Sequence, residues 1–171
     1  ASANLLNNEV GTEQAQNLAS ILKEHATLKS LCGNKGDETE LDMSGKNMGA
    51  DGAIMLAPEI VANGALVKFN ISNNELYAAG GKEIADALKD NQVMTELNLA
   101  SNELGWKANS GAASDMSGVG AIANAIPTMG ALTSLNVSDN MLGRYWDIRN
   151  KKWISDMTGV KALAAAIPKC K

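Results

Sequence analysis

The chain has 171 residues, of which 45% are hydrophobic, enough for one domain with a real core. Fifteen Lys and Arg against nineteen Asp and Glu give a formal net charge of −4, the wrong sign for general binding to nucleic acid. No apolar run approaches the ~20 residues of a membrane span, and the first residues lack the pattern of a signal peptide. We therefore expect a cytoplasmic protein that binds neither nucleic acid nor membrane.

Five segments in chain order carry the alternating apolar pattern of short strands. Residues 66–76, 94–104 and 132–142 superimpose without gaps on the pattern L-x-x-L-x-L-x-x-N-x-L, and residues 4–10 and 39–48 are weaker copies. The asparagine position, called the marker below, is occupied in turn by Asn8, Lys46, Asn74, Asn102 and Asn140. Since a lysine side chain has no acceptor, we expect Asn47 to replace it or the turn to be irregular there.

A helix is predicted after each strand, because the apolar period changes from 2 to roughly 3.6. The apolar residues that begin these helical patterns are Leu18, Leu56, Ile84, Ile122 and Leu163. Neighbouring markers are 28 residues apart in the middle of the chain and 38 apart at either end. A strand and helix of this length cannot bury an apolar face alone, so the units must stack through right-handed parallel crossovers.

Glycines 52, 80, 118 and 159 are predicted to belong to the turns that lead into four of these helices. Ser117 and Thr158 are candidate N-caps, and Pro127 and Pro168 should end their helices early because proline lacks a backbone N–H.

The motif, its asparagine and the 28-residue unit resemble the leucine-rich repeats of the ribonuclease-inhibitor type. The resemblance implies a single domain over residues 1–171 with an α/β fold. That fold would be a short right-handed horseshoe of about five repeats, with a parallel sheet on the concave side and helices on the convex side.

Three inserts interrupt the repeats, at about residues 32–40, 105–117 and 143–157. By composition the first is a surface loop, and Cys32 at its start is a buried filler and not a nucleophile. The other two leave consecutive repeats at the same structural point, so they should be neighbours in space. They hold most of the aromatic residues and several cations; the candidates for partner binding are Trp106, Arg144, Tyr145, Trp146, Arg149, Lys152 and Trp153.

Two interpretations of these aromatic inserts remain open. Rings beside cations suit an acidic peptide, a phosphate or a stacked ring. Alternatively, the tryptophans pack on each other and cap the open C-terminal end of the repeats.

The solvent-facing strand positions supply the second set of candidates for partner binding, which are Asp42, Lys68, Asn70, Glu96, Asn98 and Asn136. This surface is small, polar and mildly acidic and carries no aromatic anchor, whereas binding energy is usually concentrated in Trp, Tyr and Arg.

No catalytic arrangement, metal site or cofactor motif is found. We expect a non-enzymatic module that binds a protein partner through the strand face, the aromatic inserts or both. The alternatives are a regulator of an enzyme, similar to GTPase activators or ribonuclease inhibitors, a ligand-binding protein, or a repeat fragment of a larger receptor, since the chain begins in mid-repeat.

Overall fold

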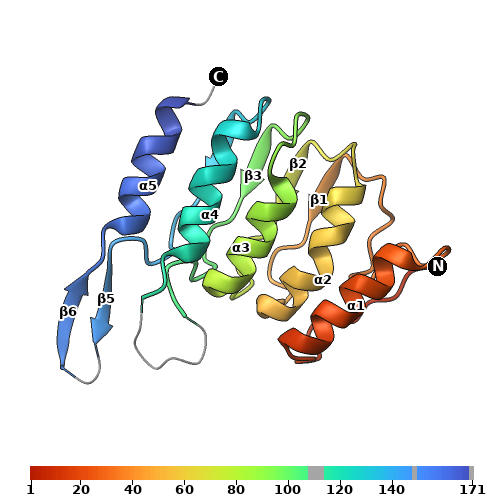
Figure 1. The fold of residues 1–171 in the computed structure, drawn as a ribbon, viewed down its shortest axis with the longest axis horizontal. Coiled ribbons are helices and arrows are strands. Elements are labelled where there is room, and N and C mark those ends of the chain that lie inside the picture. The colour runs from red at the N-terminus through yellow and green to blue at the C-terminus, as the bar shows by residue number, and fades with distance from the viewer. Residues whose placement is uncertain (108–113, 148–149, 170–171) are drawn as a thin grey trace.

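The computed structural model describes residues 1–107, 114–147 and 150–169. Helix and strand alternate along most of the chain, so that the helices form one layer and the strands another (Figure 1). The elements are α1 (Thr12–Glu24), β1 (Glu40–Asp42), α2 (Gly49–Ala62), β2 (Lys68–Asn70), α3 (Tyr77–Leu88), β3 (Glu96–Asn98), α4 (Ser117–Ala125), η1 (Ile126–Thr128), β4 (Ser134–Asn136), β5 (Arg144–Asp147), β6 (Lys152–Ser155), α5 (Thr158–Ala166) and η2 (Ile167–Lys169).

The four short strands β1 to β4 form a parallel sheet in sequence order. The register aligns equivalent repeat positions, so that Leu41, Phe69, Leu97 and Leu135 lie side by side. The segment at residues 4–10, predicted as a first strand, forms no regular strand. The N-terminal segment instead lies beside the residues just before the first insert: the N–H groups of Ala3 and Leu5 donate to the carbonyls of Ser30 and Leu31 at 2.9 and 2.8 Å.

Most of the first insert is exposed, in agreement with the predicted surface loop, but its start is anchored in the core. Leu31, Cys32 and Asn34 are buried, and the carboxylate of Glu59 on α2 holds them in place. One oxygen of Glu59 accepts the N–H groups of Leu31 and Cys32, and the other accepts from Ser30 Oγ and Asn34 Nδ2, at 2.7–3.0 Å. A buried carboxylate needs such donors, because an unpaired charge in the interior is very costly.

The apolar positions of the repeat form the core between the two layers. Leu97, Leu99 and Leu104 are buried as predicted, and the helical positions Leu56 and Ile84 are completely enclosed. The helices pack in sequence order, each on the next, from α1 to α5. Their apolar faces thus cover one face of the sheet and leave the other to solvent.

The turns after β1, β2 and β3 are each supported by the asparagine of the next repeat. Asn74 Oδ1 accepts the N–H groups of Lys46 and Met48 at 2.9 and 3.3 Å, while Asn74 Nδ2 donates to the carbonyl of Met43 at 2.8 Å. At Lys46 the backbone is regular, since Gly45 and Asn47 have positive φ, as do the residues on either side of Asn74. The expectation for Asn47 was wrong: the hydrogen bonds at Lys46 come from the next repeat.

The helix starts differ from the prediction at two positions. Ser117 and Thr158 are the first helical residues, and their N–H groups donate to the carboxylates of Asp115 and Asp156 at 3.0 and 3.1 Å. Asp115 and Asp156, two residues earlier, therefore accept the hydrogen bonds at the helix starts that were predicted for the hydroxyls of Ser117 and Thr158. At the other end of each helix the prediction is confirmed, because α4 and α5 stop just before the 3-10 turns that contain Pro127 and Pro168.

The glycines near the helix starts serve close packing. A Cβ at Gly118 would lie 2.6 Å from the carbonyl oxygen of Ala78 on α3, and one at Gly80 would lie 3.1 Å from Ala53 on α2. They lie inside the first turn of their helices and allow neighbouring helices to approach, because a glycine places no Cβ against the facing helix.

Candidate functional site

The six strand-face candidates are brought together on the exposed face of the sheet. The strand register places Lys68 between Glu40 and Glu96, and two positions further on it aligns four Asx residues. The resulting shallow hollow of about 630 Å³ is lined by all six candidates: Asp42, Lys68, Asn70, Glu96, Asn98 and Asn136.

The charged residues of this face are already paired with one another. Lys68 Nζ lies 3.1 Å from a carboxylate oxygen of Glu40 and 3.7 Å from one of Glu96. The hydrogen bond with Glu40, with the charges of both carboxylates, raises the pKa of the Lys68 ammonium. All three side chains are solvent-exposed, so these ion pairs are screened and contribute little to stability.

The Asx residues of the strand face have a structural role that the sequence analysis missed. Asp42, Asn70, Asn98 and Asn136 each accept, through Oδ1, the N–H group two residues further on, at 2.9–3.2 Å. Hydrogen bonds from the hydroxyl and the N–H of Ser44 hold the pKa of Asp42 below its ordinary value. Asx side chains commonly form such local turns, so their repetition in the sequence was the available signal.

The third insert contains an antiparallel hairpin, β5 and β6, where only a loop was expected. The hairpin projects beyond the start of α5, at the opposite end of the molecule from α1 (Figure 1). Two short runs of residues that favour strands, Tyr145–Trp146 and Trp153–Ile154, stand on either side of polar residues around Asn150 and were the sequence signal for it. The candidate Arg149 lies outside the described residues.

Trp146 and Trp153 are cross-strand partners in the hairpin. Their ring centroids are 5.5 Å apart with an interplanar angle of 68°, an edge-to-face contact. Even so, Trp146 is 41% and Trp153 58% exposed. The guanidinium carbon of Arg144 lies 4.7 Å from the centroid of the Trp153 ring. The hairpin therefore presents two indoles and a cation on one side.

The opposite side of the hairpin contacts the second insert, as the shared departure point of the two inserts predicted. Trp106 and Tyr145 meet edge to face with centroids 6.2 Å apart. Ser114 Oγ also donates to Asp156 Oδ2 at 2.8 Å. The open interpretation of the tryptophans is thus half correct. Trp146 and Trp153 pack on each other, but the hairpin projects past the start of α5 and away from the layer of helices (Figure 1).

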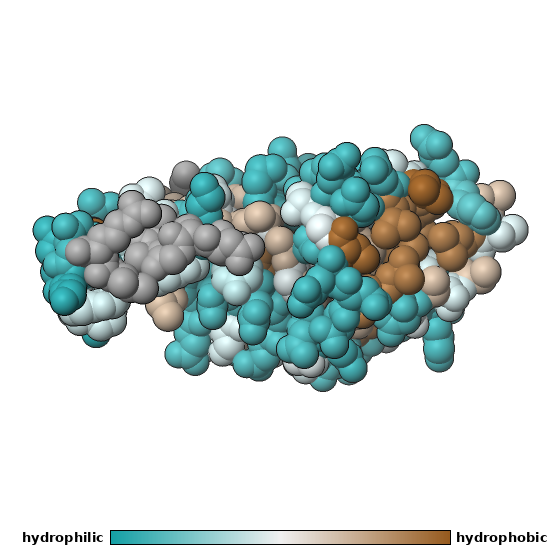
Figure 2. All heavy atoms as spheres, turned by 90° about the horizontal axis from the view of Figure 1, so that it is seen from below, coloured by the Kyte–Doolittle hydropathy of each residue, from teal (hydrophilic) through white to brown (hydrophobic). Residues whose placement is uncertain are grey.

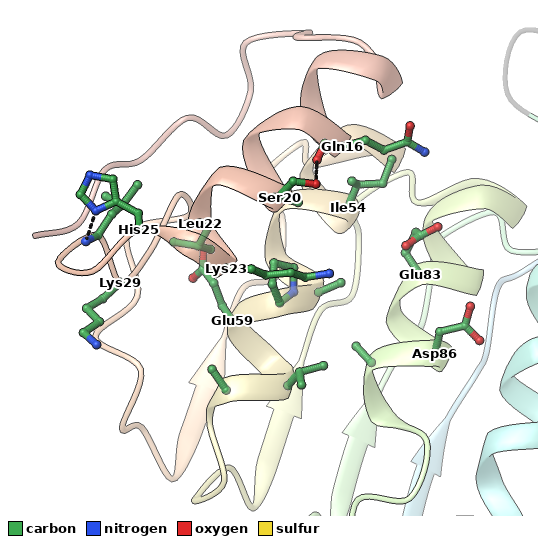
Figure 3. A pocket seen from close by; sticks show the side chains of 17 residues that line it. Gln16, Ser20, Leu22, Lys23, His25, Lys29, Ile54, Glu59, Glu83 and Asp86 are labelled. Carbon is green, nitrogen blue, oxygen red and sulfur yellow. Dashed lines mark hydrogen bonds between the residues drawn. The ribbon is translucent and has the colours of Figure 1, made fainter.

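A hollow of about 710 Å³ lies on the helix side, between α1, α2 and α3, and the sequence analysis did not anticipate it. Figure 3 shows Lys23 and His25 from the α1 side and Glu83 and Asp86 on α3 around it. Small residues of α2, Ala57 and Pro58 among them, contribute to its lining. Viewed from below, the molecule gathers apolar side chains toward its N-terminal end and is mostly polar elsewhere (Figure 2).

Cys32 does not have the environment of a reactive cysteine. Burial raises the pKa of its thiol far above the ordinary value, and the charge and hydrogen bond of Glu59 raise it further. Because the thiolate is the nucleophile, this side chain is inert, in agreement with the prediction. Among the residues that the structure describes, no group of His, Cys, Asp or Glu is arranged to hold a metal ion. The helices in the same residues are too short or too polar to cross a membrane.

Comparison with known proteins agrees with the repeat pattern. The family model described as "Leucine Rich repeat" matches residues 90–105, which contain β3 and the marker Asn102. The match supports a leucine-rich repeat protein. No curated protein matches the chain.

Among solved structures, the chain is similar to one titled "Leiomodin-1 Actin-Binding Site 2 (ABS2)". The two sequences are 16% identical, and the match covers 98% of this chain and 81% of that chain with a TM-score of 0.45.

Proposed function

We propose that this protein is a non-enzymatic protein-binding module of the cytoplasm, built as a single short right-handed horseshoe of about five ribonuclease-inhibitor-type repeats. The parallel strands in sequence order and the layer of helices on one face of the sheet support this architecture. A stack of this kind is rigid because each repeat packs on its neighbours. It can therefore hold a binding surface in a fixed orientation.

The hairpin is the main binding surface. The observation that carries this assignment is the exposure of Trp146 and Trp153 on an arm that projects from the stack. Large exposed rings are unfavourable in water, and indoles are among the side chains that contribute most to protein interfaces. The contact of Tyr145 with Trp106 holds the arm against the second insert, so the rings are presented by an anchored element.

The strand face is a secondary surface in this proposal. Lys68 is paired with two carboxylates, and the Oδ1 atoms of the Asx residues already accept backbone hydrogen bonds. A partner at this face would have to compete with those interactions. We therefore expect the strand face to tune specificity and the hairpin to supply most of the affinity.

Affinity capture with matched variants tests this division. Trp146→Ser combined with Trp153→Ser removes both exposed rings, and Lys68→Ala combined with Asn136→Ala alters the strand face. Proteins that the wild-type chain retains from an extract should be lost with the hairpin variant and kept with the strand-face variant. Circular dichroism should show the same helix content in all three proteins. Equal recovery of partners by the wild type and the hairpin variant would contradict the assignment.

A further inference from the structure

We infer that the exposed side of the hairpin recognises an acidic protein segment in which a carboxylate lies close to a large apolar side chain. The inference rests on the proposed role of the hairpin and adds the chemistry of the partner.

The two sides of the hairpin differ in exposure. Residues alternate between the sides along each strand, so Arg144, Trp146, Trp153 and Ser155 share one side. All four are exposed, whereas Tyr145 and Ile154 on the other side are half-buried. Both indoles and the guanidinium of Arg144 thus lie on the exposed side, while Tyr145, Asp147 and Lys152 lie on the other.

Arg144 lies over a ring while its hydrogen-bonding groups stay available. A guanidinium that stacks on an aromatic face keeps its N–H donors at the edge, where they can bind a carboxylate with two parallel hydrogen bonds. Among the described residues, Arg144 forms no ion pair with a carboxylate. The Trp153 contact also limits the conformations of the arginine, so less side-chain entropy is lost when a carboxylate binds.

The charge around the hairpin favours an acidic partner. Its described residues include Arg144, Lys151 and Lys152 against a single carboxylate, Asp147, in a chain whose net charge is −4. The Asp147 carboxylate accepts hydrogen bonds from the N–H and the side chain of Asn150 across the hairpin turn. A local positive patch on an acidic protein orients an acidic segment toward the hairpin and repels a basic one.

The tryptophans favour a peptide over a free phosphate. Phosphate sites gather several donors around one point, usually backbone N–H groups at a helix start together with cations. Here one guanidinium lies beside two partly exposed indoles. The guanidinium matches a carboxylate, and the indoles match an aromatic or aliphatic side chain that follows it. A peptide can satisfy both groups at once, and a phosphate only the first.

Tryptophan fluorescence tests the inference directly. In a Trp106→Phe background the two remaining tryptophans both belong to the hairpin. The probes are the synthetic peptide acetyl-Gly-Glu-Glu-Phe-Glu-Glu-Gly-amide, the same peptide with Gln for every Glu, the same peptide with Ala for Phe, and inorganic phosphate. We expect the Glu–Phe peptide to change the fluorescence saturably. The Gln version and the Ala version should bind about tenfold more weakly or worse, since one loses the charged contacts and the other the aromatic contacts. Phosphate should displace the acidic peptide only at concentrations at which a simple salt also displaces it.

Matched variants assign the effect to Arg144. Arg144→Gln should weaken binding of the acidic peptide about tenfold, and Arg144→Lys should recover only part of it, because an ammonium lacks the planar pair of donors. Lys161→Gln on α5 removes one positive charge elsewhere and should leave binding unchanged. The exciton signal of the Trp pair in circular dichroism reports whether the hairpin persists in each variant. If Arg144→Gln loses this exciton signal, its weaker binding cannot be assigned to the guanidinium. The binding of Arg144→Lys relative to the wild type then tests the role of the guanidinium.

The outcomes separate this inference from the proposed function. Equal binding of the Gln peptide, competition by phosphate at peptide-like concentrations, or no binding of any peptide would overturn the acidic chemistry. The hairpin would still be the binding surface if its double variant loses the captured partners. Retention of those partners by the double variant would overturn the proposed function itself.

Discussion

The Oδ1 atom of Asn140 accepts a hydrogen bond from the backbone N–H of Asn102, its counterpart one repeat earlier, at 2.9 Å. Asn102 accepts in the same way from the N–H of Asn74, and Asn74 from that of Lys46. Asn74, Asn102 and Asn140 thus form a buried ladder that joins the repeats from β1 to β4. Each rung also donates to carbonyls of its own turn and of the preceding repeat.

Loss of one rung should be costly. In Asn102→Ala, the carbonyls of Ile71, Leu99 and Ala100 lose a buried donor, and the N–H of Asn74 loses its acceptor. We expect the free energy of unfolding to fall by at least about 2 kcal/mol, since each unpaired buried group costs about 1–3 kcal/mol. Asn8→Ala is the matched control, because that marker is exposed and bonds only its own turn. Urea denaturation measures the free energy of unfolding of both variants. An equal loss in the two variants would contradict the stabilising role of the ladder.

Two glycines of α4 should respond in opposite directions to the same substitution. Gly118→Ala places a Cβ 2.6 Å from the carbonyl oxygen of Ala78, which forces α3 and α4 apart and should cost about 1–3 kcal/mol. Gly120→Ala meets no atom within 4 Å and should stabilise the helix by roughly 0.5–1 kcal/mol. Thermal denaturation of both variants measures the difference. Similar melting temperatures would refute the close packing of the two helices.

Glu59 should control the order of the first insert. In Glu59→Gln, an amide N–H₂ replaces a carboxylate oxygen opposite Asn34 Nδ2, so two donors face each other and stability should fall by about 1–3 kcal/mol. Adding Asn34→Asp restores a donor–acceptor pair and should recover part of the loss. Exposure of Cys32 to a thiol reagent reports local opening, measured in a Cys170→Ser background. Unchanged Cys32 reactivity in Glu59→Gln would show that the insert does not depend on this carboxylate.

Asp156 should contribute stability only where it is ionised. Hydrogen bonds from the hydroxyl and N–H of Thr158 and from Ser114 hold its pKa below the ordinary value of 3.8. A depressed folded-state pKa means that the contribution is complete above the unfolded-state pKa and is lost as pH falls through the folded-state value. Asp156→Ala should therefore destabilise the protein near pH 6 by about 1 kcal/mol or less, since the group is largely exposed to solvent.

The difference between wild type and Asp156→Ala should shrink as the pH falls to about 2, because the wild type then loses the same interactions. Urea denaturation at both pH values measures it, with Asp37→Ala as the control carboxylate. A difference that stays constant across this range would mean that Asp156 acts through packing and not through its charge.

Much of the strand-face site could be predicted from the sequence, because strand residues two apart share a face and the constant spacing aligns equivalent positions. Lys68 and Asn70 follow from that rule alone. The paired state of Lys68 and the local hydrogen bonds of Asn70 could not be predicted, since they depend on side-chain positions relative to neighbouring strands and turns. The hairpin candidates were recognised by residue type, but their arrangement as a cross-strand Trp pair depends on strand register.

The order of strand and helix, the inward apolar positions and the turn asparagines follow from the sequence, because a repeated pattern imposes the same local geometry on the units from β1 to β4. The groups that meet across units follow from the three-dimensional packing alone. Glu59 bonds Ser30 and Asn34, 29 and 25 residues away in the chain, Ser114 bonds Asp156 on the next insert, and Trp146 faces Trp153. Such contacts depend on the path of irregular segments, which have no repeat to align them and are fixed by the packing around them.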